Sequence, residues 1–200
     1  MSFRSKSTDS FNTRKRFFIF DCVLNNRNLI IEDDFIKFEI TEQLVQLFTA
    51  EYYQIEGNKT LKSHPSPLTI NEIYARMKSI EEMQVAELKI LEKKYFEEIF
   101  KSQFPENTFN ELNKADHCYY CGLTMQDIEL LADKNKLYKK NERGWHFEID
   151  RKKPNLEYTV ENCVAACYWC NNAKTDEFDD IEFKPIGEQI GSTLKNRLLS

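Results

Sequence analysis

Four cysteines of this chain occur as two C-x-x-C pairs, Cys118/Cys121 and Cys167/Cys170. A two-residue spacer lets both thiolates of a pair point at one ion, and two such pairs supply the four ligands of a tetrahedral zinc site. The alternative is a pair of disulfides, which is typical of small secreted scaffolds. No signal-peptide pattern opens the chain, so the spacing favours structural zinc over disulfides.

The segment between the two pairs carries residues suited to acid–base and metal chemistry. Residues 145–150 are predicted to form a short strand, whose side chains alternate between two faces. One face would carry His146, Glu148 and Asp150, and the buried face would carry Trp145, Phe147 and Ile149. A turn at 153–155, a second strand at 162–166 and a helix from about Asn171 to Phe178 would follow. Zinc would tie this unit to the first cysteine pair.

Positive charge gathers around this segment, although the whole chain has a net charge of −5. Residues 134–153 hold eight basic side chains against three acidic ones. The basic residues are Lys134, Lys136, Lys139, Lys140, Arg143, Arg151, Lys152 and Lys153. This stretch could bind a phosphate backbone, and the alternative is a solvated lysine-rich loop. The acidic total argues against a protein that coats nucleic acid indiscriminately.

The part of the chain before residue 106 is predicted to be mainly helical. Residues 1–16 are Ser-rich and basic with few apolar groups, so a flexible basic tail is expected there. Residues 17–20 and 29–31 have strand-like composition around an Asn-rich turn, which allows a hairpin. A helix is predicted over 42–53 and would end at Gly57 and Asn58.

The clearest helix signal starts at Thr69, because Thr69 and Glu72 have the spacing of a capping box. The apolar stripe that follows predicts a helix over about 70–101, on the order of 30 residues and 45 Å long. Such a helix could pack in an ordinary core, pair with a second copy to form a homodimer, or hold the cysteine-containing unit at a fixed distance. Pro105 then marks a boundary between two parts of the chain.

The composition is that of a folded protein, with 41% hydrophobic residues and only 5 Gly and 5 Pro. No apolar run approaches the roughly 18 to 20 residues that a membrane span needs, so we expect a soluble, cytoplasmic protein. Cys22 and Cys163 stand outside the paired motif and are expected to be free packing thiols in a reducing compartment.

The stretch HFEIDRKKPNLEYTVENCVAACYWCNNAKTD, with CYYC upstream, resembles the HNH nuclease family. That family's ββα-metal unit is commonly written as a zinc knuckle, an Asp-His pair, a central Asn, and a second knuckle followed by Asn or His. The resemblance covers residues 117 to about 178 and is closest to the subgroup in which Arg follows the Asp. It implies a zinc-stabilised HNH-type nuclease unit with a C-terminal helix over 106–200. Together with the flexible tail (1–16) and the mainly helical domain (17–105) predicted above, this gives an expected α+β fold.

Carried over by position, Asp150 and Asn171 correspond to the family's ligands for a catalytic divalent cation. The resemblance gives Asn162 the role of cross-linking the loop between the strands through its side-chain amide. Carboxylate and amide oxygens are ligands that Mg²⁺ and Mn²⁺ accept in proteins. Lys174, one turn after Asn171, could contact the same phosphate, and the alternative is a solvent-exposed lysine. Nucleic-acid contacts are further expected from Arg151, Lys152 and Lys153.

One position departs from the family pattern, because Arg151 stands where the general-base histidine usually follows the Asp. Arginine stays protonated and cannot accept a proton from water, although it could clamp a phosphate oxygen. The base must then be Glu148, His146 or hydroxide formed on the metal. His117, beside Cys118, could replace a cysteine on zinc, but four thiolates already complete a structural site.

Two classes of function follow from these residues. The resemblance implies a bacterial or phage-encoded, metal-dependent endonuclease that acts on DNA, in restriction, phage defence or DNA mobility. The alternative is a zinc-ribbon unit that binds nucleic acid or a protein partner and does not cut. RNA as the substrate is a third reading, since the sequence does not separate DNA from RNA.

Overall fold

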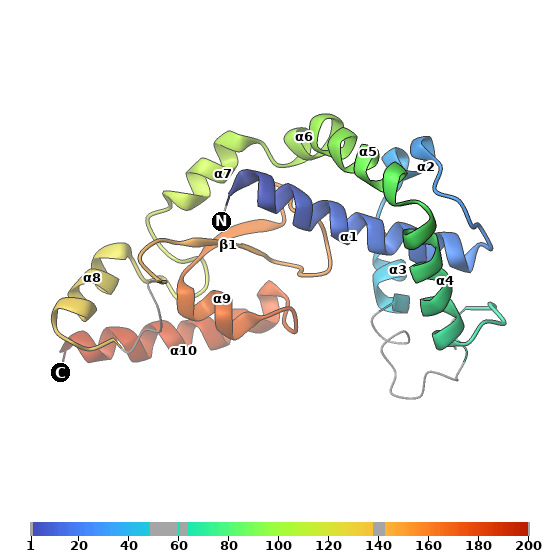
Figure 1. The fold of residues 1–200 in the computed structure, drawn as a ribbon. Coiled ribbons are helices and arrows are strands. Elements are labelled where there is room, and N and C mark those ends of the chain that lie inside the picture. The colour runs from blue at the N-terminus through green and yellow to red at the C-terminus, as the bar shows by residue number, and fades with distance from the viewer. Residues whose placement is uncertain (1, 49–59, 61–63, 138–142, 200) are drawn as a thin grey trace. The chain divides into compact units, whose positions relative to one another are not determined.

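The computed structural model describes residues 2–48, 60, 64–137 and 143–199. Its fold is α+β, with many helices and one two-stranded sheet among the described residues (Figure 1). Clustering of the backbone gives an N-terminal unit, Ser7–Lys101, and a C-terminal unit, Met1–Lys6 with Ser102–Ser200. The end of the helix expected over 42–53, and Lys139 and Lys140 of the basic stretch, lie outside the described residues.

Residues 3–16 are helical and do not form the expected flexible tail, because α1 spans Phe3–Leu24. Several polar side chains of this helix are buried, and long-range hydrogen bonds satisfy them. Ser10 Oγ accepts from Tyr95 Oη at 2.8 Å, and Arg14 Nη1 donates to the backbone oxygen of Phe38 at 2.7 Å. Since these partners lie far away in sequence, the composition of residues 1–16 gave no sign of them.

The expected hairpin at 17–31 is also absent from the described residues, and α1 takes its place. Phe17, Phe18, Ile19 and Phe20 are each at most 1% exposed, so this stretch of helix is buried on every side. A helix with apolar residues all round shows no periodic stripe, and that is why these residues resembled a strand. Asn26, with φ of 53°, turns the chain after the helix ends.

The long helix expected over 70–101 exists as separate segments. They are α4 (Ile70–Met83), α5 (Val85–Tyr95), the π-helical turn η2 (Phe96–Phe100) and α6 (Lys101–Gln103). The predicted capping box at Thr69 and Glu72 is confirmed at the start of α4. The break falls at Gln84, whose side chain accepts from Ile30 N at 2.8 Å and donates to Asn28 O at 3.3 Å. Shorter helices α2 (Glu32–Lys37) and α3 (Glu42–Leu47) complete the described part of this unit.

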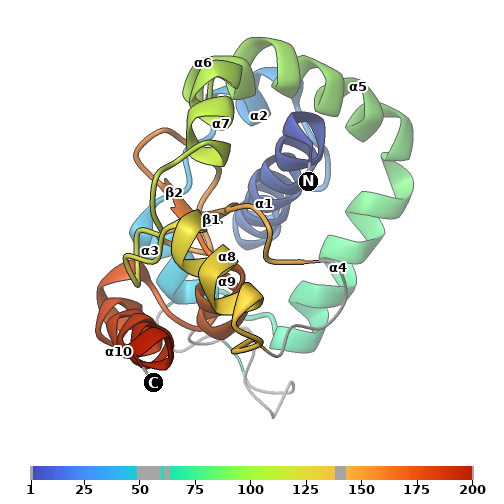
Figure 2. The same ribbon diagram turned by 90° about the vertical axis from the view of Figure 1, so that its left-hand side faces the viewer.

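The C-terminal unit is built around a small antiparallel sheet. Strand β1 (Glu148–Arg151) pairs with β2 (Cys163–Ala166), with Glu148 opposite Ala166 and Arg151 opposite Cys163. Its helices are α7 (Glu106–Asn113), α8 (Met125–Asp133), α9 (Tyr168–Lys174) and α10 (Asp180–Leu199). Helix α9 packs against β1, and α10 packs against both α8 and α9 (Figure 2). None of the described helices has both the length and the apolar character that crossing a membrane requires.

The strand expected over 145–150 is shorter at its beginning. Trp145 and His146 form a bend before β1, and Trp145 is 46% exposed, so it does not belong to the buried face. Phe147 and Ile149 are buried as expected. The helix expected from Asn171 begins three residues earlier, at Tyr168, and therefore includes Cys170.

The first residues of the chain are part of the C-terminal unit. The ring of Phe3 lies 6.4 Å from that of Phe104 and 5.6 Å from that of Phe109. Lys6 is 4% exposed, and its Nζ donates to the backbone oxygen of Ile149 and to Tyr158 Oη, both at 3.0 Å. The N-terminal segment thus supports the strand that carries the predicted site.

Candidate metal centre and active site

The first cysteine pair sits in a tight turn. Gly122 N donates to Cys118 O, and Cys118 N donates to Leu123 O, both at 2.9 Å. Gly122 has φ of 65°, a left-handed conformation that glycine adopts without strain. This turn brings Cys118 and Cys121 to the same side, as a zinc knuckle requires.

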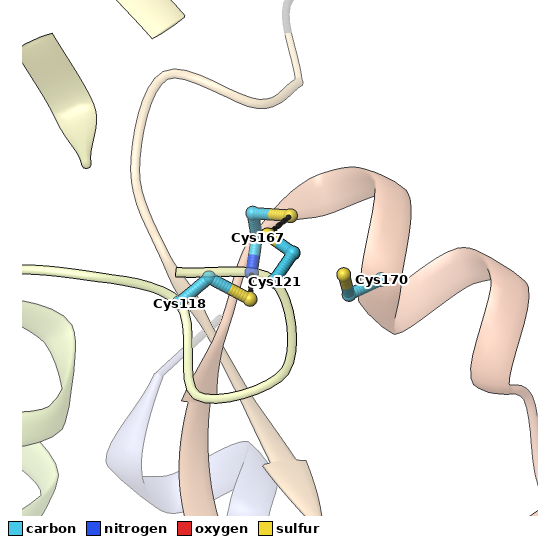
Figure 3. Close-up of side chains that lie close together, drawn as sticks. All are labelled: Cys118, Cys121, Cys167 and Cys170. Atoms are coloured by element: carbon cyan, nitrogen blue, oxygen red, sulfur yellow. Dashed lines mark hydrogen bonds between the residues drawn. The ribbon is translucent and has the colours of Figure 1, made fainter. Parts of the chain in front are cut away.

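The four paired cysteines converge on one point (Figure 3). Their Sγ atoms all lie within 4.8 Å of one another, and every residue of the set is buried. Cys121 and Cys167 have sulfurs 3.6 Å apart. A zinc ion with bonds of about 2.3 Å to each sulfur would hold tetrahedral sulfurs about 3.8 Å apart, whereas a disulfide requires about 2.05 Å. The cluster therefore fits a Cys₄ metal site and not a pair of disulfides.

Helix α10 backs the first knuckle through two glycines. A Cβ added to Gly191 would lie 2.2 Å from the backbone oxygen of Cys121, and one added to Gly187 would lie 2.7 Å from Tyr120 Cβ. Both distances are shorter than any tolerable contact, so only glycine allows this approach of helix to knuckle. The sequence pattern gave no sign of this contact.

The remaining two cysteines behave as ordinary buried thiols. Burial raises the pKa of Cys22 to about 11 and that of Cys163 to about 12. At neutral pH both are therefore protonated. Both side chains are buried, as packing residues are.

Strand β1 and helix α9 share a polar face, in which two side chains of the strand each contact one side chain of the helix. Glu148 Oε2 accepts a hydrogen bond from Asn171 Nδ2, and Asp150 Oδ2 lies 3.3 Å from Lys174 Nζ. The two carboxylates are two residues apart on the strand, and their partners are three apart on the helix. Those spacings place residues on one face of each element. Four of the predicted site residues thus lie on this face: Glu148, Asp150, Asn171 and Lys174.

Asp150 is the most enclosed carboxylate of this face, with a side chain only 12% exposed. Burial raises its pKa, and the hydrogen bond from Tyr120 together with the charge of Lys174 opposes that rise. Tyr120 Oη donates to Asp150 Oδ2 at 2.6 Å, and its own pKa is raised, chiefly by burial. A carboxylate offers about four lone-pair positions, so two donors leave Asp150 with acceptor capacity.

Glu148 is held by an arginine that the sequence did not single out. Arg143 Nη2 lies 2.6 Å from Glu148 Oε1, and Arg143 Nη1 lies 3.5 Å from Asn172 Oδ1. The guanidinium also stacks 5.0 Å from the ring of Tyr168. The hydrogen bond with Glu148 raises the pKa of Arg143. Arg143 lay in the predicted basic stretch, but nothing in its spacing marked it apart from its neighbours.

Asn162 bridges the loop between the two strands. Its Nδ2 donates to the backbone oxygens of Lys153 at 3.1 Å and Glu157 at 2.9 Å, and its Oδ1 accepts from Lys153 N at 2.9 Å. The residue is buried, so these bonds satisfy an amide that would otherwise be costly to bury.

Two basic residues expected to contact phosphate are turned inward. Lys174 is fully buried, and its Nζ donates to the backbone oxygen of Arg151 at 2.8 Å as well as facing Asp150. Arg151 is 16% exposed, donates to Leu156 O at 3.1 Å and lies 5.1 Å from the Tyr158 ring. Because side chains alternate along β1, Arg151 points away from the face that carries Asp150. In this structure both side chains are thus engaged by the protein itself, and their phosphate contacts stay a prediction.

The other residues considered in the sequence lie in the segments that flank β1 and the first cysteine pair. His146 is exposed and precedes β1, so it is not on the strand with Asp150. Lys153 is exposed, and Lys152 Nζ lies 5.9 Å from the Tyr119 ring. His117 pairs its backbone with Thr124 in an isolated bridge beside the knuckle.

The donor set of the polar face suits a hard divalent cation. Asp150 and Glu148 supply carboxylate oxygens, and Asn171, which donates through Nδ2, keeps its carbonyl oxygen for a metal. Among the described residues the cysteines are the only cluster of three or more His, Cys, Asp or Glu ligands. Mg²⁺ typically binds through one or two carboxylates and completes its shell with water and phosphate, which agrees with so small a set.

Comparisons with known proteins give one partial likeness. No protein-family model matches the sequence, and no curated protein matches it. The solved structure of the rare-cutting HNH restriction endonuclease PacI is 29% identical, with a TM-score of 0.35. That match covers 43% of this chain and 58% of PacI, so the aligned part is less than two thirds of PacI's length.

Proposed function

We propose that this chain is an HNH-type endonuclease that hydrolyses phosphodiester bonds of DNA with a divalent cation. The observation that carries the proposal is the shared face of β1 and α9, where Glu148 accepts from Asn171 and Asp150 faces Lys174, on the helix that also carries Cys170. A purely structural zinc unit needs four cysteines and a core. It has no need of two largely buried carboxylates, whose burial has to be offset by cationic partners.

Asp150 and Asn171 would hold Mg²⁺ or Mn²⁺, while the four cysteines would hold zinc. The catalytic ion would polarise the scissile phosphate and neutralise charge on the leaving 3′ oxygen. Asn162 would keep the loop between the strands in a fixed shape, so that β1 presents Asp150 in one position.

Glu148 is the general base that the geometry supports best. Its carboxylate lies on the same face as Asp150 and against Asn171, whereas His146 is exposed on the bend before the strand. In the proposed step a water oxygen bonds to phosphorus, its proton passes to Glu148, and the bond from phosphorus to the 3′ oxygen breaks. The departing oxygen takes a proton from solvent.

Arg143 would bind phosphate in addition to the role predicted for Arg151. Its side chain is 50% exposed and belongs to the same polar face through Glu148. The planar guanidinium could bind two oxygens of one phosphate, which a lysine cannot do. Lys152 and Lys153, on the loop after β1, would add contacts to the backbone of the substrate.

For the biological role we propose restriction or phage defence. This part of the proposal rests on the resemblance of the sequence motif to the HNH nuclease family. The N-terminal unit would select the target or partner, and a homodimer through its helices remains part of the proposal. RNA as the substrate would use the same residues, and the test below includes it.

A second candidate is a zinc unit that binds nucleic acid or protein without cutting it. Two observations favour it. Arg151 occupies the usual place of the base, and Lys174 and Arg143 already balance the charges of Asp150 and Glu148 without a metal.

Cleavage of supercoiled plasmid separates the two candidates. We expect the full-length protein to nick the plasmid with Mg²⁺ or Mn²⁺ and not with EDTA, and Asp150→Ala to remove the activity while zinc stays bound. Single-stranded DNA and RNA should be assayed in parallel. If no substrate is cut by zinc-loaded protein, the binding unit is the better account, and if Asp150→Ala still cuts, the site lies elsewhere.

A further inference from the structure

We infer that Tyr120, inside the first C-x-x-C pair, is a positioning residue that holds Asp150 in its working orientation. The inference deepens the proposed function and rests on it, because it concerns the same carboxylate. It makes the cysteine cluster a support for the polar face in addition to its part in the stability of the fold.

The contact itself is a short, enclosed hydrogen bond. Tyr120 Oη lies 2.6 Å from Asp150 Oδ2, within the range of an O–H group bound to a charged carboxylate. Tyr120 is fully buried, and the Asp150 side chain is 12% exposed, so little water competes for either group. A hydrogen bond in such surroundings is stronger than one exposed to solvent.

The tyrosine has no freedom to move away from the carboxylate. It lies between Cys118 and Cys121, whose sulfurs converge on the same point. Its ring packs edge-on against Phe183, with centroids 5.1 Å apart, and Gly187 of α10 leaves no room beside its Cβ. The knuckle therefore fixes the tyrosine, and the tyrosine fixes one oxygen of Asp150.

Lys174 also contacts Asp150 Oδ2, but substituting it would test the inference less clearly. Its removal would leave a largely buried carboxylate without a charge partner, which is strongly destabilising. Tyr120→Phe removes a single oxygen atom and keeps the ring that packs on Phe183. The loss of the hydrogen bond is then separated from the loss of packing.

The neighbouring tyrosine provides a matched control. Tyr119 lies in the same knuckle, is 39% exposed, and donates to Asp180 Oδ2 at 3.3 Å on the surface. Tyr119→Phe makes the same chemical change one residue away and leaves Asp150 untouched. Any effect common to both variants would belong to the knuckle and not to the carboxylate.

The experiment measures binding of Mn²⁺ to the zinc-loaded, full-length protein by electron paramagnetic resonance, which reports the free ion without any turnover. Plasmid nicking is followed as a function of Mn²⁺ concentration. Partners that orient a metal ligand are typically worth about 10- to 100-fold in metal affinity. We therefore expect Tyr120→Phe to weaken Mn²⁺ binding by about 10- to 100-fold and to shift the Mn²⁺ dependence of nicking by a similar factor. Tyr119→Phe should match the wild type, and both variants should keep zinc.

Each outcome has a distinct meaning. If the wild type binds Mn²⁺ and cuts, and Tyr120→Phe does the same at equal Mn²⁺ concentration, the inference is rejected and the proposed function stands. If the wild type neither binds Mn²⁺ nor cuts, both are rejected. Loss of zinc from Tyr120→Phe would also overturn the inference, because the hydroxyl would then serve the knuckle and not Asp150.

Discussion

The cysteine cluster and the polar face of β1 and α9 share one helix, yet the fold prepares them differently. The four thiol sulfurs lie close together, and the contacts described for them are with one another and with the backbone N–H of Cys167. No charged side chain is among those described contacts. On the polar face each carboxylate already has a cation, Arg143 for Glu148 and Lys174 for Asp150.

This difference teaches what each cluster requires. The sulfur site is complete as soon as zinc enters, so its binding energy becomes folding energy. The polar face is electrically balanced without a metal, since Arg143 and Lys174 offset Glu148 and Asp150. A divalent cation bound together with a singly charged phosphodiester would raise the net charge of the face by only one. We therefore expect loss of the first site to unfold the C-terminal unit and loss of the second to abolish activity with the fold intact.

The largest expected effect comes from breaking the sulfur site. Cys167→Ser removes one zinc ligand, and structural zinc contributes about 10 to 16 kcal/mol in small zinc domains. We expect the variant to lose zinc, measured by elemental analysis, and to lose the cooperative unfolding of the C-terminal unit in thermal melts. Cys163→Ser is the matched control, because Cys163 is buried on β2 but is not part of the cluster.

The control should keep its zinc and lose only modest stability. If Cys167→Ser retained zinc and an unchanged melting curve, or if both serine variants behaved alike, the four cysteines would not form the metal site. The comparison between the two clusters would then have no basis.

The sulfur site was predictable because its chemistry is local. The two-residue spacing within each cysteine pair indicates both a zinc knuckle and the turn that forms it. The capping box at Thr69 likewise depends on residues only three positions apart. The polar face was predictable in part, since the alternation along a strand placed Glu148 and Asp150 together.

The partners of the polar face were not predictable, because they depend on distant packing. Tyr120 and Asp150 are 30 residues apart, and no spacing rule joins them. The same holds for α1, whose buried Ser10 and Arg14 find their partners in α5 and at the end of α2. The partners of Arg151 were not predictable either, because Leu156 O and the Tyr158 ring lie in the loop after the strand.

The next effect in size concerns the polar face. Glu148→Gln keeps the shape of the side chain and removes its ability to accept a proton. General-base catalysis typically contributes about 10²- to 10⁴-fold, so we expect nicking to slow by about that factor at saturating Mg²⁺. Zinc content and melting temperature should stay close to wild type.

His146→Ala tests the competing base under the same conditions. We expect it to slow nicking far less than Glu148→Gln, because His146 is exposed and lies before the strand. The reverse order of effects would make His146 the base and would show that substrate binding rearranges the bend at 144–146.

The smallest expected effect comes from a substitution that disturbs the packing around the cysteine cluster but removes no zinc ligand. A Cβ at position 191 would lie 2.2 Å from the backbone oxygen of Cys121, so Gly191→Ala must push α10 away from the knuckle. Overpacking of this kind typically costs about 1 to 3 kcal/mol.

Ser192→Ala, on the exposed side of the same helix, is the control for the added helix propensity of alanine. Gly191→Ala should lower the melting temperature and speed zinc release to a chelator, while the polar face keeps its residues and the remaining folded protein still nicks plasmid. If Gly191→Ala were as stable as Ser192→Ala, α10 would not be the support of the knuckle, and the rigidity ascribed to Tyr120 would have to come from the zinc alone.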